Sequence, residues 1–246
     1  MKLALFDIDG TLTQTSRVDD QCFVQSFADE LGVTGIDTNW ANYPTVCDWG
    51  LTREIFQRYL QRQPSADELM RLQRRFVALL EQAYEQDPLQ FAAIPGAGGA
   101  LRELRQRHDW AVAIATGGWE LSARFKLEKA QIDIEGIPAA FADHGITREV
   151  ILATAIVLAR RMYQQEQFSH IVYIGDGVWD VRTARQLNLA FLGVASGERE
   201  AALRAAGATA IIQNFADIAQ FRQVIEELVY GKSVVCASAE SSGRPR

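Results

Sequence analysis

Two aspartates near the start of the chain, Asp7 and Asp9, are placed where they could act together on one ligand. They follow the apolar run 3–6, and side chains two residues apart in a strand share a face. If that run is a strand of a parallel sheet, both carboxylates lie at its carboxyl end, where such sheets open a ligand crevice. A plain turn at Asp9-Gly10 is the alternative, because Asp-Gly is a frequent turn pair.

A threonine follows a second apolar run in the same way. The run 110–115 leads into Thr116, Gly117 and Gly118. The hydroxyl and the exposed backbone donors of this segment suit a phosphoryl oxygen at the start of a helix. Thr116 can also be a helix N-cap, which is a common role for threonine, and the two interpretations are compatible.

A third apolar run, 170–174, leads into Asp176 and Asp180 and again puts acids at the end of a strand. Taken alone, this segment could be a turn with a helix-capping aspartate. Three strand ends that all carry ligand-binding groups are not easily explained by capping.

The four aspartates Asp7, Asp9, Asp176 and Asp180 would repel one another strongly if the strand ends brought them together. Two like charges about 4 Å apart cost about 4 kcal/mol at an effective dielectric of about 20. A cation must therefore lie among them. Carboxylate and carbonyl oxygens suit a hard ion, and Mg²⁺ that keeps several waters fits best. The histidines of the chain are scattered and give no zinc spacing.

The elements that must position these residues follow a regular order. Short apolar runs alternate with amphipathic stretches, which is the pattern of β-α units around a parallel sheet buried on both faces. The sequence therefore predicts an α/β fold with a mainly parallel sheet between two layers of helices. We expect strands at 3–6, 110–115, 170–174, 189–194 and 208–212, and a weaker one at 137–141.

The stretch after the first strand differs, because strand patterns are missing from it. Segments 19–31, 52–62 and 66–85 have the apolar spacing of helices, which predicts an all-helical insertion. A glycine-rich loop at 95–99 marks the return to the α/β pattern. It lacks the G-x-G-x-x-G spacing of a dinucleotide site, so we expect a loop before a helix.

These patterns predict a division of the chain into three parts. The α/β core domain comprises 1–14 and 95–231, and the helical cap domain comprises 15–94. The last residues, 232–246, are rich in Ser and Ala and are predicted to be a mobile tail.

The composition narrows the class of protein. The chain has 246 residues and a formal net charge of -6 at pH 7, which argues against a nucleic-acid or membrane partner and favours a small substrate. A signal-peptide core and a membrane-spanning run are not visible, so we expect a cytoplasmic location. Cys22, Cys47 and Cys236 are scattered, which predicts reduced thiols rather than disulfides or a thiolate metal site.

In the order and spacing of these motifs the chain resembles the haloacid dehalogenase (HAD) superfamily over nearly its whole length. The matching segments are Asp7-x-Asp9-Gly10-Thr11 for the first motif, Thr116 for the second and Gly175-Asp176-Gly177-x-x-Asp180 for the fourth. The helical insertion resembles the cap of the phosphoglycolate phosphatase and β-phosphoglucomutase group. The resemblance implies a Rossmann-like three-layer core with a small all-helical cap inserted after the first strand.

The resemblance also implies a phosphatase that forms an aspartyl-phosphate intermediate. Asp7 would be the nucleophile that attacks phosphorus, and Asp9 would protonate the leaving oxygen and later activate the attacking water. Mg²⁺ would be held by Asp7, the Asp9 carbonyl and Asp176. Asp180 would orient Asp176 or a metal-bound water.

The phosphoryl oxygens would be held by Thr116, Gly117 and the cation of the third motif, where this sequence departs from the family. A lysine is usual there, at the start of the helix before the fourth motif, but segment 144–149 contains Arg148 instead. We assign the role to Arg148, whose guanidinium can neutralise the same charge bidentately. Lys126 is the alternative, although we expect it on a solvated helix face.

The expected substrate is a small phosphorylated metabolite. The segment 42–50 of the cap, with Tyr43 and Trp49, is a candidate for selecting it, although both aromatics could simply pack the cap helices. A phosphomutase of the β-phosphoglucomutase type is the first alternative, because it would use the same Asp7 and Asp9. A dehalogenase is less expected, since it needs neither Asp9 nor the acidic metal site. A non-catalytic ligand-binding module that keeps the metal site is an alternative of another class.

Overall fold

The core of the molecule is a six-stranded parallel sheet. The computed structural model describes residues 1–230, and the strand order within them is β3-β2-β1-β4-β5-β6. Every pair of neighbouring strands is parallel. The strands are β1 (Lys2–Phe6), β2 (Trp110–Ala115), β3 (Ala139–Ala140), β4 (Ile171–Gly175), β5 (Ala190–Val194) and β6 (Ala210–Ile212).

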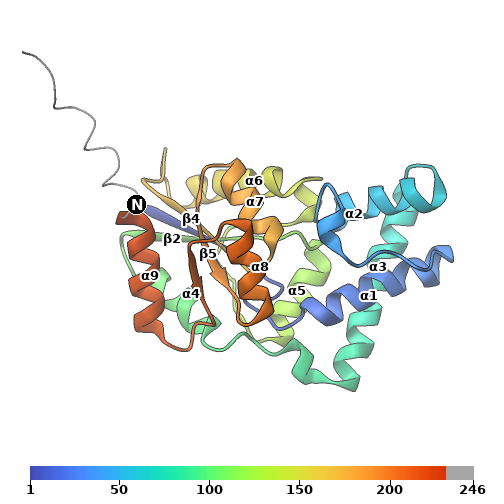
Figure 1. Ribbon diagram of the computed structural model, residues 1–246, viewed down its shortest axis with the longest axis horizontal. Coiled ribbons are helices and arrows are strands. Elements are labelled where there is room, and N and C mark those ends of the chain that lie inside the picture. The colour runs from blue at the N-terminus through green and yellow to red at the C-terminus, as the bar shows by residue number, and fades with distance from the viewer. Residues whose placement is uncertain (231–246) are drawn as a thin grey trace, which may run out of the picture.

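Helices cover both faces of this sheet and complete a three-layer α/β core. One face packs against α6 (Arg148–Met162), α7 (Val178–Gln186) and α8 (Glu198–Ala206). The other face packs against α4 (Ala97–Arg105), α5 (Glu120–Lys129) and α9 (Ile218–Tyr230). Figure 1 shows α6 and α7 on one side of the strands and α4 and α9 on the other.

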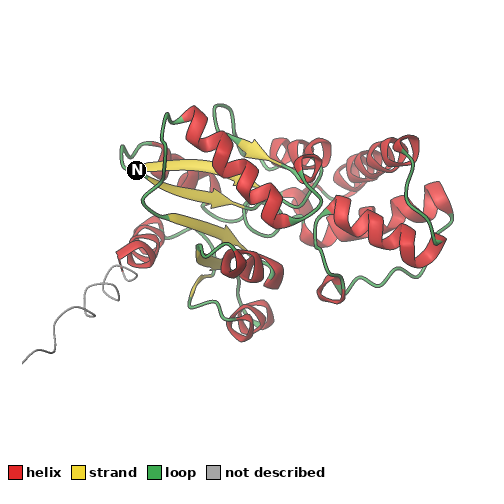
Figure 2. Cartoon of the chain, turned by 90° about the horizontal axis from the view of Figure 1, so that it is seen from above, coloured by secondary structure: helices red, strands yellow, loops and turns green. Residues whose placement is uncertain are grey.

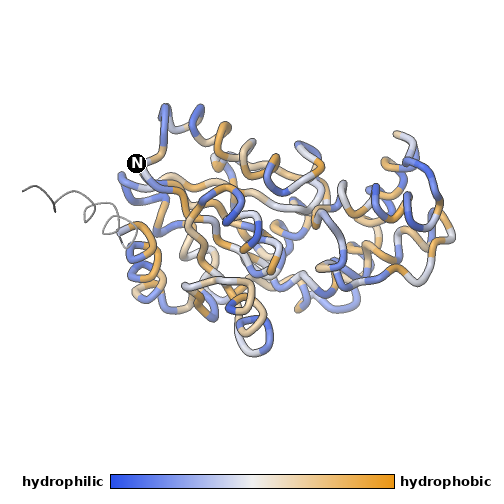
Figure 3. Tube along the Cα trace, turned by 45° about the horizontal axis from the view of Figure 1, so that its top comes forward, coloured by the Kyte–Doolittle hydropathy of each residue, from blue (hydrophilic) through white to orange (hydrophobic). Residues whose placement is uncertain are grey.

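Side-chain alternation along the strands explains why both faces need a cover. In β1, Leu3 and Leu5 belong to one apolar cluster, whereas Ala4 and Phe6 belong to the other. Successive side chains of a strand point to opposite faces, so a strand that is apolar throughout must be covered twice. The strands accordingly run as hydrophobic segments through the middle of the molecule in Figure 3.

Between β1 and α4 the chain forms a separate group of helices. The long ones are α1 (Ser16–Leu31), α2 (Asp48–Ile55) and α3 (Ala66–Gln86). Shorter helical turns lie at Trp40–Asn42, Phe56–Leu60 and Pro88–Phe91 in this region and at Ala142–His144 after β3. The group lies beyond the carboxyl ends of the strands, as Figures 1 and 2 show. It therefore faces the edge of the sheet where ligands bind in parallel α/β folds.

Aromatic rings hold this helical group together. Phe23 packs edge to face against Phe27 and Phe76, and Phe27 packs against Phe56 in the same way. All four rings are buried, and they are continuous with the apolar cluster that covers one face of the sheet. Such aromatic pairs contribute about 0.5–1.5 kcal/mol each beyond the burial of their area.

The predicted fold class is confirmed. Each expected strand is present, and the two shortest, β3 and β6, are the edge strands, which pair on one side only. The expected helices at 19–31 and 66–85 correspond to α1 and α3, whereas the one at 52–62 begins earlier, at Asp48, as α2. The domain boundaries stay a prediction.

Three sequence-based expectations concern the chain as a whole. Cys22 and Cys47 are free thiols, and both are buried. Cys236 and the predicted tail, 232–246, lie outside the described residues. Within residues 1–230, each helix is too short or too polar to cross a membrane.

Candidate active site

Three neighbouring strands bring the predicted residues together. Because β1 lies between β2 and β4, Asp7, Thr116 and Asp176 come from adjacent strand ends. All three side chains are buried. The strand order changes direction here, since the chain passes from β1 to β2 and β3 on one side and then returns to β4 on the other. Parallel sheets open their ligand crevice at this kind of switch point.

A compact group of carboxylates lies at these strand ends. One oxygen from each of Asp7, Asp176 and Asp180 lies within 4.8 Å of the other two. Among the described residues, Asp7 Oδ1 is buried without a hydrogen-bond partner, whereas Asp176 Oδ2 pairs with the exposed Arg199 at 2.9 Å. A buried oxygen without a donor and a donor set made only of oxygens fit a hard divalent cation such as Mg²⁺.

Burial and mutual repulsion act on the ionisation of these acids. Burial raises the pKa of Asp176 to about 7. Burial also raises the pKa of Asp7, with Arg148 opposing the shift and the nearby Asp180 and Asp176 reinforcing it. A bound cation would favour the ionised form of each acid and reverse both shifts.

The Asp9-Gly10 turn is real and is part of the site. Gly10 has a φ of +74°, which favours glycine, and a Cβ there would lie 2.0 Å from Asp176 Oδ2. The turn therefore packs the first motif directly against the fourth. The turn and the ligand site are the same feature rather than alternatives.

Asp180 is fully occupied by hydrogen bonds. Its Oδ1 accepts from Tyr173 Oη at 2.8 Å and from Arg148 Nη1 at 2.6 Å, and its Oδ2 accepts from the backbone N–H of Gly177 at 2.9 Å. With both oxygens engaged, this side chain is rigidly held beside Asp176 and Asp7. That arrangement suits an orienting role better than direct ligation.

Arg148 reaches the same group from the first residue of α6. Thr147 caps this helix by accepting a hydrogen bond from the backbone N–H of Val150 at 3.3 Å. The Arg148 Nη1 lies 3.6 Å from Asp7 Oδ1, and its Nε donates to the Val46 carbonyl at 2.6 Å. The guanidinium therefore links the nucleophile candidate to the fourth motif and to the helical group.

The side chain of Asp9 is not part of the carboxylate group formed by Asp7, Asp176 and Asp180, and it bonds to other partners. Asp9 Oδ1 accepts from Thr15 Oγ1 at 2.5 Å, and Asp9 Oδ2 accepts from Lys126 Nζ at 2.6 Å. Lys126 Nζ also donates to Asp19 Oδ1. Burial alone would lower the pKa of Lys126, but Asp19, Asp9 and Asp48 outweigh that effect and raise it, so the ammonium stays charged.

The expectation that Lys126 lies on a solvated helix face is wrong. Its side chain has an exposed fraction of 0%. The buried residues of α5 are Ser122, Ala123, Lys126 and Leu127, so the lysine sits within the buried stripe of its own helix. A lysine on such a buried stripe needs acidic partners, and Asp9 and Asp19 supply them.

The second-motif loop joins the core to the helical group. Thr116 is not an N-cap, because α5 begins at Glu120; its Oγ1 accepts instead from the backbone N–H of Gly118 at 3.1 Å. Glycine at 117 lets the loop approach Arg148 closely, since a Cβ there would lie 2.8 Å from Arg148 Nη2. Its carbonyl accepts from the backbone N–H of Asp48, at the start of α2, at 2.8 Å.

The sequence did not single out Asp48, which bonds the same loop a second time. Its carboxylate accepts from the backbone N–H of Trp119 at 2.8 Å, and burial raises its pKa to about 7. Within segment 42–50, Val46, Cys47 and Asp48 line the site, whereas the buried Tyr43 packs against Trp40 with ring centroids 5.5 Å apart. Tyr43 is therefore a packing residue.

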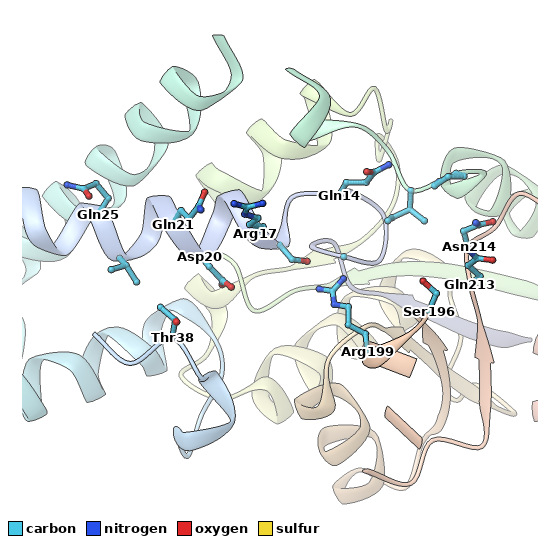
Figure 4. A pocket seen from close by; sticks show the side chains of 15 residues that line it. Gln14, Arg17, Asp20, Gln21, Gln25, Thr38, Ser196, Arg199, Gln213 and Asn214 are labelled. Carbon is cyan, nitrogen blue, oxygen red and sulfur yellow. The ribbon is translucent and has the colours of Figure 1, made fainter. Parts of the chain in front are cut away.

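Two adjoining cavities open at the site. A small chamber of about 110 Å³ is lined by the acids, Thr116 and Arg148 together with Phe23 and Trp40. A larger cleft of about 1010 Å³ shares Ser16, Asp20 and Arg199 with this chamber. In Figure 4, Gln21 and Gln25 of α1 line one side of the cleft, and Ser196, Arg199, Gln213 and Asn214 line the other.

Comparison with known proteins identifies one family. A family model for haloacid dehalogenase-like hydrolases matches residues 1–188. That range contains every predicted site residue, from the first motif to the fourth. Curated proteins give no sequence match to the chain.

Several solved structures share the fold. A hydrolase from Pseudomonas syringae has a TM-score of 0.69 at 20% identity, with 91% of this chain and 98% of that one covered. A protein proposed to be a β-phosphoglucomutase, from Bacteroides vulgatus, has a TM-score of 0.65 at 14% identity, with 93% and 90% covered. A predicted phosphoglycolate phosphatase from Haemophilus somnus has a TM-score of 0.58 at 16% identity, with 91% and 98% covered.

Proposed function

The chain belongs to the haloacid dehalogenase-like hydrolases, and on this basis we propose that it is a Mg²⁺-dependent phosphatase acting on a small phosphate monoester. The observation that carries the proposal is the buried Asp7: its Oδ1 accepts no hydrogen bond from the described residues, and one of its oxygens lies within 4.8 Å of oxygens of Asp176 and Asp180. A carboxylate in this position is available both to a cation and to an electrophilic phosphorus atom.

The reaction has two steps that share the same aspartates. In the first, an oxygen of Asp7 attacks phosphorus, the bond from phosphorus to the ester oxygen breaks, and Asp9 gives its proton to that oxygen. In the second, Asp9 takes a proton from a water molecule that attacks the aspartyl phosphate, which releases inorganic phosphate and restores Asp7. One group thus serves first as acid and then as base.

Charge neutralisation is the main demand of phosphoryl transfer. Arg148 would face the phosphoryl oxygens beside Asp7, while the Thr116 hydroxyl and the Gly117 backbone would hold another oxygen. Asp7, Asp176 and the Asp9 carbonyl would bind Mg²⁺, with Asp180 orienting Asp176. When bound, the metal supplies positive charge to the phosphoryl oxygens and the carboxylates.

The cavities support a polar ester with a leaving group that lacks an aromatic ring. The chamber of about 110 Å³ is small beside the cleft of about 1010 Å³, so it suits the phosphoryl group and the cleft suits the rest of the ester. The leaving group would extend past Ser16 and Asp20 into the cleft. Among the described residues that line the cleft, none is aromatic and five carry carboxamides, which bind hydroxyls rather than stack on bases.

The test is phosphate release from a panel of esters with Mg²⁺, comprising phosphoglycolate, sugar phosphates and nucleotides. We expect steady release of inorganic phosphate, complete loss with EDTA and recovery when Mg²⁺ is added back. Formation of an isomer from a sugar phosphate without net phosphate release would indicate a mutase instead. Tight binding of an ester without turnover of any would indicate a non-catalytic module.

A further inference from the structure

Lys126 is a buried cation that has no role in the two proposed chemical steps. We propose that Lys126 is a positioning residue that holds the Asp9 carboxyl group in the orientation from which it protonates the leaving oxygen. This inference rests on the proposed function, because it assigns a support to the proposed acid. It concerns the release of the leaving group and not the charge of the phosphoryl group.

The contacts of Asp9 define its orientation. Thr15 donates to one oxygen at 2.5 Å and Lys126 to the other at 2.6 Å, so the plane of the carboxylate is fixed from both sides. Each carboxylate oxygen has two lone pairs, which leaves room for a further partner. The side chain of Asp9 keeps an exposed fraction of 19%, whereas that of Lys126 has none. Asp9 is therefore accessible from the open side of the site, whereas Lys126 is not.

A second carboxylate holds Lys126 in place. Lys126 Nζ is bonded to Asp19, which lies in the first turns of α1, and Asp48 of α2 adds a further attraction. A lysine has a flexible stem and loses considerable side-chain entropy when it is fixed. Two bonds from one ammonium to carboxylates on separate segments keep that stem in one position, and this makes Lys126 a rigid support for Asp9.

Packing alone does not account for a lysine at this position. The neighbours of Lys126 on its helix face are Ser122, Ala123 and Leu127, and an apolar side chain would fill the same space without a desolvation cost. The site also has another cation for the phosphoryl group, since Arg148 lies 3.6 Å from Asp7. The partners of Lys126 are instead the proposed acid and the two helices that cover it.

The test compares two esters that differ in their need for a proton. Nitrophenolate leaves without protonation, so hydrolysis of p-nitrophenyl phosphate does not need the acid. An alkoxide must be protonated as it leaves, so the alkyl ester of the panel that turns over fastest does need it. In Lys126→Met we expect kcat/KM to fall about 100-fold for the alkyl ester and less than about 5-fold for p-nitrophenyl phosphate. The parameter kcat/KM covers steps up to leaving-group release, so the later hydrolysis of the aspartyl phosphate does not enter it.

A double-mutant cycle with Asp9→Asn tests whether Lys126 acts through Asp9. If it does, adding Lys126→Met to Asp9→Asn should change kcat/KM for the alkyl ester less than about 2-fold. Lys129→Met is the matched control. Lys129 is half-buried, lies about one turn further along α5 and pairs with Glu128, so this change should leave kcat/KM for both esters unaltered.

Equal losses for the two esters, or additive effects in the cycle, would overturn the proposal while leaving the phosphatase intact. If Lys126→Met does not fold by circular dichroism, Asp19→Asn replaces it and should show the same preference for the alkyl ester with a smaller effect. If Asp19→Asn in turn lowers kcat/KM equally for both esters, the proposal is wrong. A wild-type protein that hydrolyses no ester would instead refute the proposed function, and this inference with it.

Discussion

Arg148 and Lys126 are two buried cations beside the same chamber, and they are held in different ways. Arg148 spreads its guanidinium over acceptors on three segments, which are Asp180, Tyr173 and the Val46 carbonyl. Lys126 places one ammonium between Asp9 and Asp19. The planar fork of arginine suits several fixed acceptors, whereas the compact ammonium of lysine suits a narrow gap between two carboxylates.

In the proposed reaction, this difference would separate two tasks within one site. The Arg148 region contacts Asp7 and the fourth motif, where the charge of the transferred phosphoryl group would be balanced. The Lys126 region contacts Asp9 and the covering helices, where the leaving oxygen would receive its proton. A site that divides these tasks should respond differently to changes on its two sides.

The largest effect is expected at the residue on which both regions depend. Asp7→Asn should lower kcat at least about 1000-fold, because it removes the nucleophile with little change in volume. Turnover of every ester in the panel would be measured, with circular dichroism to establish folding. A folded Asp7→Asn protein that keeps a tenth or more of its turnover would remove Asp7 from the mechanism.

The next effect distinguishes the two cations directly. With p-nitrophenyl phosphate, Arg148→Ala should lower kcat about 100- to 1000-fold, because it removes a positive group aimed at developing charge. Lys126→Ala should cost far less with the same ester, since no proton is needed. Initial rates for the two variants decide the ranking, and the opposite order would transfer the third-motif role to Lys126.

A smaller effect is expected at the hydroxyl between Arg148 and Asp180. Tyr173→Phe should lower the free energy of unfolding by about 1–2 kcal/mol, because Asp180 and Arg148 each lose a buried partner. Urea unfolding measures this change. Tyr59→Phe, at an exposed hydroxyl that donates to the Gly35 carbonyl, is the control and should cost less than about 0.5 kcal/mol. Equal costs for the two would mean that the Arg148 network adds no stability.

The smallest effect lies far from both cations, at the start of α3. Ser65 accepts from the backbone N–H of Glu68 at 3.3 Å and forms a capping box with it, so Ser65→Ala should cost about 1 kcal/mol of stability. Thermal unfolding would show the loss, and Ser65→Asp should restore most of it. Turnover should stay unchanged; a fall in kcat would mean that the cation regions are sensitive to general destabilisation.

The positions of the strand-end residues followed from the sequence. Apolar runs flanked by Asp7, Thr116 and Asp176 predict parallel strands, and parallel strands must deliver their carboxyl ends to one edge. Arg148 was assigned to the third motif from its place before the fourth, and it lies 3.6 Å from Asp7, while its catalytic role stays a prediction. Lys126 was misread, because the helical period alone does not tell which side of a charged helix is covered by a second group of helices.

The sequence by itself determined the α/β core, its helical insertion and the aspartates at the strand ends, because side-chain periodicity and strand direction are local properties. Only the tertiary structure decided which cation contacts which acid. Asp9, Asp19 and Lys126 are far apart in the chain, with more than a hundred residues between the lysine and either aspartate. Their contact exists because the folded chain brings Lys126 of α5 against Asp9 of the first motif and Asp19 of α1, and a buried ammonium is stable only where the fold supplies such carboxylates.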